Sequence, residues 1–399
     1  MISAQEARNI ILSSVKPLST ITVSLARARH YAVAEKIISG DDIPPFDNSA
    51  MDGYAVRYGD IKSVPIELTV VGEIGAGVIF QGTLQQNEAV SIMTGAPIPD
   101  GANTVVPIEF TEQTDQSRVK ILRNVSFGEN IRRAGEDVKR GSVVLDVGTT
   151  LRPQELGVLA ALGKNFVQIY KPANVAILTT GDEVIDMENP LKPGEIRNSN
   201  LYVLRGLSEE LGCEVVDLGN AKDNINEIRQ KVIQGLESDA LITSGGVSVG
   251  KYDFIKKVLQ ELNAEIKIQQ VNIKPGKPFV FALLGSKTIF GLPGNPVSSM
   301  VTFLHFVKPA LLKLMGRTSE IESDLKIKAT LVNEIKKSDG KMYFLRGILE
   351  SKNREFTVRS TGAQSSHLLT SLTKANCLII IPENKDMINA GDKVEVCLI

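Results

Sequence analysis

The residues best suited to chemistry begin with a glycine-rich loop, SGGVSVG, at residues 244–250. An apolar run at residues 240–243 precedes this loop, and Asp253 leads from it into a helical pattern of apolar residues, so we expect the order strand, loop, helix. Glycine lets a backbone approach an anion closely, and the first amide groups of a helix lack partners within the helix. The pattern therefore predicts a phosphate-binding loop, although a glycine-rich turn without a ligand explains this motif alone equally well. The residues assigned to the loop are Ser244, Gly245, Gly246, Ser248 and Gly250.

Two lysines form a second candidate anion site in the segment KPGKP at residues 274–278. Lys274 and Lys277 flank a rigid Pro-Gly corner, which can direct both ammonium groups at one multiply charged anion. A pair of solvated lysines is the alternative interpretation. The spacing therefore indicates an anion site only in combination with its neighbours.

A third segment, GLPGNP at residues 291–296, follows a short apolar run and precedes another helical pattern. Asn295 is suited to the N-cap of that helix and Pro296 to its first position, with Ser298 in the first turn. Together with Pro293 these residues predict another helix N-terminus that can face an anion.

Acidic residues stand beside these segments. The carboxylate of Asp253 would repel a phosphate bound to the glycine loop unless a cation lay between them. Carboxylate oxygens are suitable ligands for Mg²⁺. Glu183 and Asp223 follow strand-like runs at residues 175–178 and 215–218. Helix capping by Asp253 and Asp223 is the structural alternative. Their placement after successive strands favours a shared site, because ligands of open α/β sheets bind beyond the carboxyl ends of the strands.

The composition restricts the classes of protein that this chain can belong to. Its 399 residues exceed what one core usually supports, and its 43% hydrophobic residues are enough for several cores. A formal net charge of −1 gives no electrostatic basis for binding nucleic acid or a membrane surface. We expect no apolar run of membrane-spanning length and no signal peptide. The few, scattered cysteines and histidines argue against disulfides, a zinc site or a histidine-based hydrolase, so we expect a cytoplasmic enzyme.

Three successive patterns predict the elements that position these residues. A capping box at Ser3 opens a helix, and short strand-like runs between Gly/Pro turns then predict a mostly β region. From residue 172, apolar strands alternate with amphipathic helices, which is typical of a doubly wound α/β domain with a parallel sheet. After residue 316 only strand patterns remain, and these predict a small β barrel or sandwich.

These motifs together resemble the molybdopterin molybdenumtransferases, a family that includes bacterial MoeA and the E domain of gephyrin-like proteins. Besides the segments above, the resemblance rests on PPFDNSAMDGYAV at residues 44–56, TGAPIP at 94–99, GENIRR at 128–133 with GED at 135–137, and TGDE at 180–183. The motifs occur in the order of the family and span nearly the whole chain.

The resemblance implies an elongated four-part protomer that forms a homodimer. Its parts would be an N-terminal helical and linking region at residues 1–43 and 141–171, an inserted mostly β domain at 44–140, an α/β molybdopterin-binding domain at 172–318, and a C-terminal β barrel at 319–399. The active site would lie between the α/β domain of one subunit and the N-terminal half of the other, which contributes Asp52, Thr94 and Asp137. Turn chemistry explains Asp52 and Thr94 equally well, and an exposed loop charge explains Asp137.

The reaction that the resemblance implies is the last step of molybdenum cofactor synthesis. Adenylated molybdopterin and molybdate give the molybdenum-loaded cofactor and AMP, with Mg²⁺ held among Asp253, Asp223 and Glu183. Phosphoanhydride cleavage needs charge neutralisation and positioning more than a strong nucleophile. By the same resemblance, Arg346 and Ser366 complete an oxyanion pocket for molybdate. A solvated surface arginine and an exposed turn are the respective alternatives.

Two other functions deserve comparison. The related molybdopterin adenylyltransferase, a potential transient partner, consists of the α/β domain alone and has a Gly-Gly-Thr-Gly loop where this chain has GGVS at residues 245–248. A scaffold role of the gephyrin type finds no support, because we expect neither an appended adenylyltransferase domain nor a long disordered linker in this chain. A non-catalytic pterin-binding paralogue is disfavoured because every charged position assigned from the family is present. The sequence does not distinguish molybdate from tungstate, since both are tetrahedral dianions.

Overall fold

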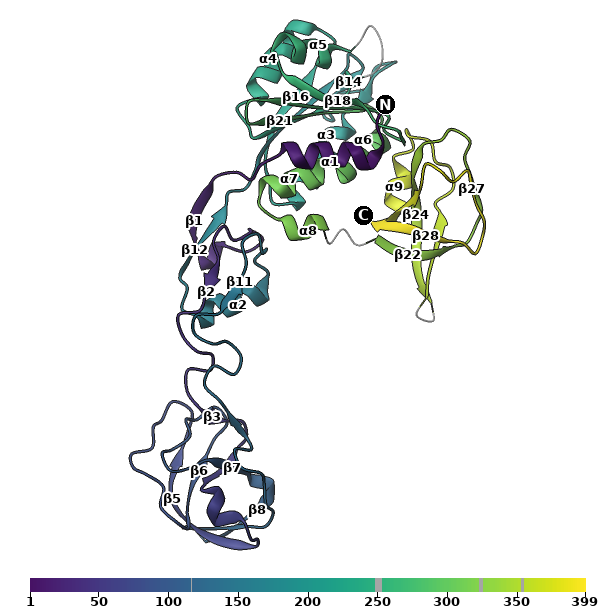
Figure 1. Ribbon diagram of the computed structural model, residues 1–399. Coiled ribbons are helices and arrows are strands. Elements are labelled where there is room, and N and C mark those ends of the chain that lie inside the picture. Colours follow the sequence, from purple (N-terminus) through teal and green to yellow (C-terminus); the bar gives the residue numbers. More distant parts are fainter. Residues whose placement is uncertain (116, 248–252, 323–325, 353–354) are drawn as a thin grey trace. The chain divides into compact units, whose positions relative to one another are not determined.

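The computed structural model describes all of residues 1–399 except 116, 248–252, 323–325 and 353–354. These residues form two compact units, which are treated separately below (Figure 1). Unit 1 comprises Met1–Ala34, Gly148–Pro153 and Phe166–Ile399, and unit 2 comprises Glu35–Val147 and Gln154–Asn165. The division into four domains expected from the family resemblance stays a prediction.

A six-stranded sheet lies at the centre of unit 1. Its order is β16 (Glu214–Ala221), β13 (Asn174–Thr180), β17 (Ala240–Ser244), β21 (Lys287–Leu292), β20 (Pro278–Leu284) and β18 (Glu265–Gln270). The first four strands are parallel, as the alternating pattern predicts, whereas β20 pairs antiparallel with β21, and β18 pairs antiparallel with β20. Every residue of β17 is buried, as expected of a parallel strand that helices cover on both faces.

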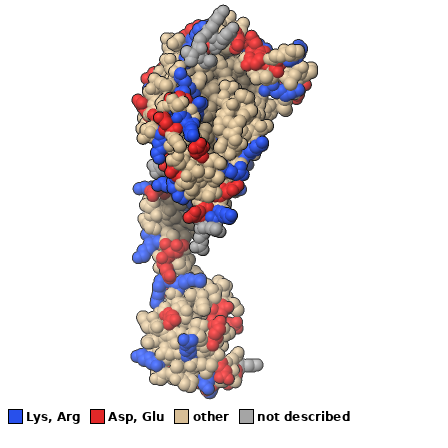
Figure 2. All heavy atoms as spheres, turned by 90° about the vertical axis from the view of Figure 1, so that its right-hand side faces the viewer, with Lys and Arg blue, Asp and Glu red and all other residues tan. Residues whose placement is uncertain are grey.

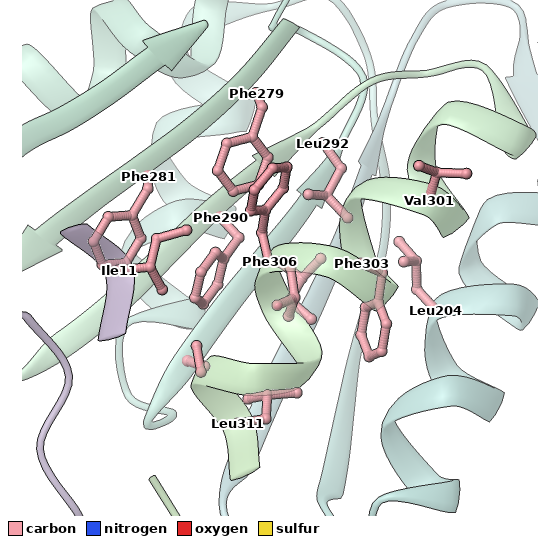
Figure 3. Packing of buried hydrophobic residues seen from close by; sticks show 14 of the residues in the cluster. Ile11, Leu204, Phe279, Phe281, Phe290, Leu292, Val301, Phe303, Phe306 and Leu311 are labelled. Carbon is pink, nitrogen blue, oxygen red and sulfur yellow. The ribbon is translucent and has the colours of Figure 1, made fainter. Parts of the chain in front are cut away.

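Helices cover both faces of this sheet, which confirms the doubly wound prediction. On one face lie α4 (Ile225–Gly235) and α5 (Phe254–Glu261), and on the other lie α1 (Ala4–Ser14), α3 (Ser199–Glu210), α6 (Pro296–Thr302) and α7 (Lys308–Leu314) (Figure 1). Figure 3 shows the aromatic centre of the second face, where the rings of Phe279 and Phe306 are 4.7 Å apart. The predicted cap of α1 is confirmed, because the Ser3 hydroxyl accepts a hydrogen bond from the Glu6 amide at 3.1 Å.

The helices α6 and α7 are joined by a π-helical turn, η4 (Phe303–Val307), into one long helix. This helix, Pro296–Leu314, is long and apolar enough by length and composition to cross a membrane. The expectation that no segment reaches that length is therefore wrong; it failed because serines and lysines interrupt the apolar pattern. An 18-residue stretch of this helix is 72% buried, and its apolar side chains belong to the core of unit 1.

The C-terminal strands close into a barrel, which decides between the two alternatives left by the sequence. The strands are β22 (Lys326–Leu331), β24 (Met342–Lys352), β25 (Glu355–Ser360), β26 (Cys377–Ile381) and β28 (Lys393–Leu398). Pairing runs from β24 through β25, β22, β28 and β26 back to β24. The short strand β19 (Ile273–Lys274), in the segment between β18 and β20, also pairs with β24 of the barrel.

Shorter elements complete unit 1. They are η1 (Leu25–Arg27), α8 (Thr318–Glu322), α9 (Thr370–Lys374) and three strand pairs: β1 (Thr20–Ser24) with β12 (Phe166–Tyr170), β14 (Val184–Ile185) with β15 (Ile196–Arg197), and β23 (Ile335–Lys336) with β27 (Met387–Ile388). The ribbon of β1 and β12 is antiparallel, with Thr20 opposite Tyr170. The pair β14 and β15 follows directly after the carboxyl end of β13, where the predicted TGDE motif lies.

Unit 2 contains a second six-stranded sheet, as predicted for a mostly β region. Its order is β7 (Thr104–Pro107), β4 (Gly53–Val56), β6 (Glu88–Ile92), β5 (Ile66–Ile74), β9 (Arg118–Ile121) and β8 (Thr111–Asp115). The other elements are η2 (Tyr58–Ile61), η3 (Ile108–Phe110), the pairs β3 (Asn48–Ser49) with β10 (Ile131–Arg132) and β2 (Ile37–Ile38) with β11 (Val143–Leu145), and α2 (Pro153–Ala161), whose first residue belongs to unit 1. A methyl group at Gly53 would lie 2.0 Å from the Val106 carbonyl oxygen, so the MDGYAV motif requires glycine there.

Candidate active site

A cavity of about 590 Å³ opens at the carboxyl ends of β13, β17 and β21. This is the edge of a parallel sheet at which α/β proteins bind ligands. Its walls come from the turns that follow these three strands, from the start of α3, and from His367 beyond β25. The predicted residues that line it are Glu183, Asp223, Ser244, Gly245, Gly246, Pro293, Asn295 and Pro296. Most residues predicted for the α/β part of the site are thus brought together.

The glycine loop begins directly at the end of β17, as predicted. Gly245 has a φ of +96°, and a methyl group there would lie 2.7 Å from the carbonyl oxygen of Thr180. The Gly245 amide donates to the Leu292 carbonyl at 3.0 Å, so the loop crosses between two strand ends. The predicted positions Ser248 and Gly250 lie outside the described residues.

Asn200 joins the two glycine-containing segments, and the sequence did not single it out. Its amide nitrogen donates to the Ser244 hydroxyl at 2.8 Å and to the Gly294 carbonyl at 2.7 Å. The preceding Asn198 caps α3 and donates to the Thr179 hydroxyl at 2.8 Å. The asparagine before a helix was a recognisable capping signal, but the bridge made by Asn200 depends on segments far away in the chain.

Two buried polar atoms of the cavity walls have no hydrogen-bond partner within the described part of the chain. They are the hydroxyl oxygen of Thr180 and the amide oxygen of Asn200. Buried polar atoms in native proteins are nearly always hydrogen-bonded. Both atoms therefore suit a ligand that brings polar groups into the cavity.

Three carboxylates gather at the ends of β13 and β16. Asp182 accepts a hydrogen bond from the Asp223 amide at 3.0 Å, and Glu183 and Asp223 line the cavity. Burial, followed by repulsion from Asp182 and Glu183, raises the pKa of Asp223. The alternative that Asp223 caps α4 is wrong, because Asn224 does so by accepting from the Asn226 amide at 2.9 Å.

Asp253 occupies the N-cap position of α5 but makes no side-chain capping bond. One of its oxygens lies 2.6 Å from the Lys256 ammonium, and both side chains are only 14% exposed. Its other oxygen is buried and has no partner among the residues that the structure describes. The capping alternative is therefore wrong for Asp253 as well, and a cation at this carboxylate would compete with Lys256.

Two carboxylates of the cavity wall, Glu183 and Asp223, are the groups available to Mg²⁺. Among the residues that the structure describes, no group of three or more His, Cys, Asp or Glu side chains is arranged to hold a metal. Mg²⁺, however, usually takes only one or two protein carboxylates and completes its shell with water and substrate phosphates. Glu183 and Asp223 fit that pattern, since a cation bound to them would offset the burial and the carboxylate repulsion that together raise the pKa of Asp223.

The lysine loop lies along the first turns of α6. A methyl group at Gly276 would lie 2.6 Å from a side-chain carbon of Thr302, and 3.6 Å from the Ser298 carbonyl oxygen. Lys274 and Lys277 are exposed, whereas Ser298 is buried. Asn295 and Pro296 begin α6 as predicted, although Asn295 makes no side-chain capping bond. The lysine loop therefore packs against α6, and Pro278 of the same segment lines the cavity.

Arg346 is fully buried in the barrel, so the surface alternative is wrong. Its guanidinium donates to the carbonyl oxygens of Gln364 at 3.2 Å and Ser365 at 3.1 Å, and to the Ser371 hydroxyl at 2.9 Å. These bonds hold the loop at residues 363–367, whose Ser366 carbonyl accepts from the Val297 amide of α6 at 3.2 Å. Arg346 thus shapes the cavity wall through His367, which no motif of the sequence singled out.

The remaining predicted residues belong to unit 2. One carboxylate oxygen of Asp52 accepts from the amide and the hydroxyl of Thr94, at 2.7 and 2.8 Å, and these bonds lower the pKa of Asp52. The backbone amide of Asp137 donates to the Ile43 carbonyl at 3.0 Å. These contacts agree with turn chemistry for Asp52 and Thr94. A catalytic role for the three residues stays a prediction.

The parallel sheet with a polar cavity at its carboxyl edge, beside a lysine loop, defines an α/β protein built to bind an anionic ligand. Three family models match successive parts of the chain: the MoeA N-terminal region (domain I and II) at residues 2–163, a probable molybdopterin binding domain at 176–313, and the MoeA C-terminal region (domain IV) at 328–399. This chain belongs to the molybdopterin molybdenumtransferase family.

Individual relatives agree over the full length. A molybdopterin molybdenumtransferase of Haemophilus influenzae is 39% identical and the match covers 99% of this chain and 98% of the relative. One from Staphylococcus aureus (strain COL) is 35% identical over 100% of this chain and 95% of the relative. The crystal structure of the molybdopterin biosynthesis moeA protein from Pyrococcus horikoshii OT3 superposes with a TM-score of 0.87, at 32% identity and full coverage of both chains.

Proposed function

We propose that this chain transfers molybdenum from molybdate to adenylated molybdopterin and releases AMP in a Mg²⁺-dependent reaction. The observation that carries the proposal is the cavity of about 590 Å³, in which a glycine loop, unpartnered polar atoms and two carboxylates face one space. Family membership supplies the substrate class, since the relatives bear the name molybdopterin molybdenumtransferase.

Two neighbouring regions would bind the two substrates. Backbone amides of Gly245 and Gly246 suit the phosphate groups of the adenylated pterin, and the polar atoms of Thr180 and Asn200 suit its other polar groups. The exposed ammonium groups of Lys274 and Lys277 suit molybdate, because a tetrahedral dianion asks for cations and hydrogen-bond donors. Both regions border α6: Pro296 at its start lines the cavity, and Gly276 of the lysine loop lies against Ser298 and Thr302.

Charge neutralisation and positioning are the main demands of phosphoanhydride cleavage. Glu183 and Asp223 would hold Mg²⁺, which when bound neutralises charge on the phosphoryl oxygens. The lysines neutralise the second anion, and Asn200 keeps the glycine loop and the start of α6 at a fixed separation. No histidine or cysteine nucleophile is required in this scheme.

Several finer features belong to the same proposal. The protein would act as a cytoplasmic homodimer, in which Asp52, Thr94 and Asp137 of one subunit complete the cavity of the other. The four-domain boundaries and a transient contact with molybdopterin adenylyltransferase are proposed on the same family basis. On the face shown in Figure 2, acidic and basic side chains are interspersed, which together with the net charge of −1 supports small anionic substrates over nucleic acid.

The decisive experiment measures AMP release from adenylated molybdopterin with and without molybdate and Mg²⁺. Release that rises with molybdate, needs the cation and falls in Asp223→Asn and Lys277→Ala supports the proposal. Glu237→Gln is the matched control, because this exposed carboxylate precedes β17 at the opposite end of the sheet. Tight binding without release would instead indicate a non-catalytic pterin-binding protein, and adenylation of molybdopterin from ATP would indicate an adenylyltransferase.

A further inference from the structure

A cluster of charged side chains surrounds Tyr343 where the barrel meets the lysine loop. The Lys274 ammonium donates to the Tyr343 hydroxyl at 3.0 Å and lies 4.9 Å from the centre of the ring. Asp339 is 3.6 Å from the same ammonium. Lys274 is therefore not the freely solvated lysine that its motif allows, although its side chain is 56% exposed.

The backbone fixes this contact. Lys274 lies in β19 directly opposite Tyr343 in β24, so pairing of the two strands sets the distance between the side chains. Tyr343 is only 8% exposed. Beneath it, the buried Lys337 lies 5.6 Å from the ring centre and donates to the carbonyl oxygens of Lys341 at 2.7 Å and Glu383 at 2.9 Å. The tyrosine is thus a rigid support.

Asp339 completes a chain of hydrogen bonds. The Tyr343 hydroxyl accepts from Lys274 and donates to Asp339, which also binds Lys341 at 2.8 Å. Partial burial raises the pKa of Asp339, but the hydrogen bonds from Lys341 and Tyr343 outweigh it and hold that pKa at about 2. Asp339 is therefore an anion throughout the physiological range. Lys341 lies closer to Asp339 than Lys274 does, at 2.8 Å against 3.6 Å, and neutralises most of the charge of this carboxylate. The positive charge of Lys274 is therefore left for a substrate.

We propose that Tyr343 and Asp339 of the barrel are positioning residues, which hold the Lys274 ammonium beside α6 so that it can bind the oxyanion substrate. A lysine has a flexible stem and three donors, so fixing two of its contacts lowers the entropy cost of using the third. The inference rests on the proposed function in one respect, namely that the oxyanion at Lys274 is molybdate. The hydrogen-bonded geometry itself is independent of that assignment.

Tyr343→Phe is the sharpest test, because it removes the hydroxyl and keeps the ring. We expect the KM for molybdate in the AMP-release assay to rise about three- to ten-fold, as for the loss of one hydrogen bond, with kcat changed less than about two-fold. The same substitution in a Lys274→Ala background should have no further effect on this KM. An unchanged KM, or an equal increase in both backgrounds, would overturn the proposal.

A second measurement separates this inference from the proposed function. Lysines methylated with carbon-13 formaldehyde can be titrated by NMR, and the Lys274 signal is identified by its loss in Lys274→Ala. The Tyr343 hydroxyl raises the pKa of Lys274, so Tyr343→Phe should lower it. An unshifted Lys274 pKa would refute the positioning role even if AMP release depends on molybdate. AMP release that ignores molybdate would refute the proposed function alone.

Discussion

Replacing Arg346 by methionine tests whether its guanidinium holds a protein loop or binds the oxyanion. The structure gives this side chain hydrogen bonds to Gln364, Ser365 and Ser371, and a longer one of 3.4 Å to the Ala363 carbonyl. Methionine would fill much of the space but leave these carbonyl groups unpaired. A hydrogen bond from a charged donor contributes about 1.5–3 kcal/mol, and the contributions are not additive, so we expect a loss of about 3 kcal/mol in the free energy of unfolding of unit 1.

The assay is urea denaturation followed by circular dichroism, because the chain has no tryptophan for fluorescence. Arg359→Met is the matched control in the same barrel: Arg359 pairs with Glu350 at 3.4 Å, and both side chains are about half exposed. Such a surface pair contributes less than about 1 kcal/mol. If Arg346→Met unfolded like Arg359→Met while the KM for molybdate rose, the guanidinium would face the oxyanion and our account of the loop would be refuted.

Three further predictions concern the cavity. Gly245→Ala forces a methyl group to within 2.7 Å of Thr180 at a φ of +96°, so calorimetry should show pterin affinity reduced at least about ten-fold, and undiminished affinity would exclude a role for this loop. Asp223→Asn should abolish Mg²⁺-dependent AMP release yet leave the apo protein as stable or more stable at neutral pH. Because the pKa of Asp223 is raised, the folded state binds more protons than the unfolded state, so the contribution of Asp223 to stability falls as the pH rises above the usual pKa of an aspartate. Urea denaturation at pH 4 and pH 7 should therefore show a smaller decrease in the free energy of unfolding for the variant than for the unmodified protein. Asn200→Ala removes two bonds that join the cavity walls and should weaken pterin binding more than it lowers the melting temperature, whereas the reverse would make Asn200 purely structural.

The elements were predictable because their patterns are local. Alternation of apolar strands with amphipathic helices gave β13, β16 and β17 with the helices that follow them, and short strand runs gave the barrel. The strands β18 and β20 were not among the predicted ones, and the antiparallel pairing that adds them to the parallel strands joins segments on either side of the lysine loop. Element type depends on neighbouring residues, whereas sheet order depends on contacts far apart in the chain.

The site was predictable only in part, because some of its residues are brought together by contacts between segments far apart in the chain. The glycine loop, Glu183 and Asp223 follow strand ends directly, so their convergence follows from the fold class. His367 reaches the cavity only because barrel closure and Arg346 bring residues 363–367 to α6. Arg346 itself shows the limit most clearly, since a charged residue near a predicted oxyanion site is buried and bonded to its own barrel.

The shared core of unit 1 has a consequence for how the protein can be divided. Phe344, Leu378 and Ile380 of the barrel belong to the same apolar cluster as α1, the sheet and the long helix of Figure 3. The first and last segments of the chain therefore bury their side chains together. A fragment ending before the barrel would expose this surface and leave the Val297 amide without its acceptor. The α/β sheet and the barrel, although they look like separable modules, form one cooperative folding unit.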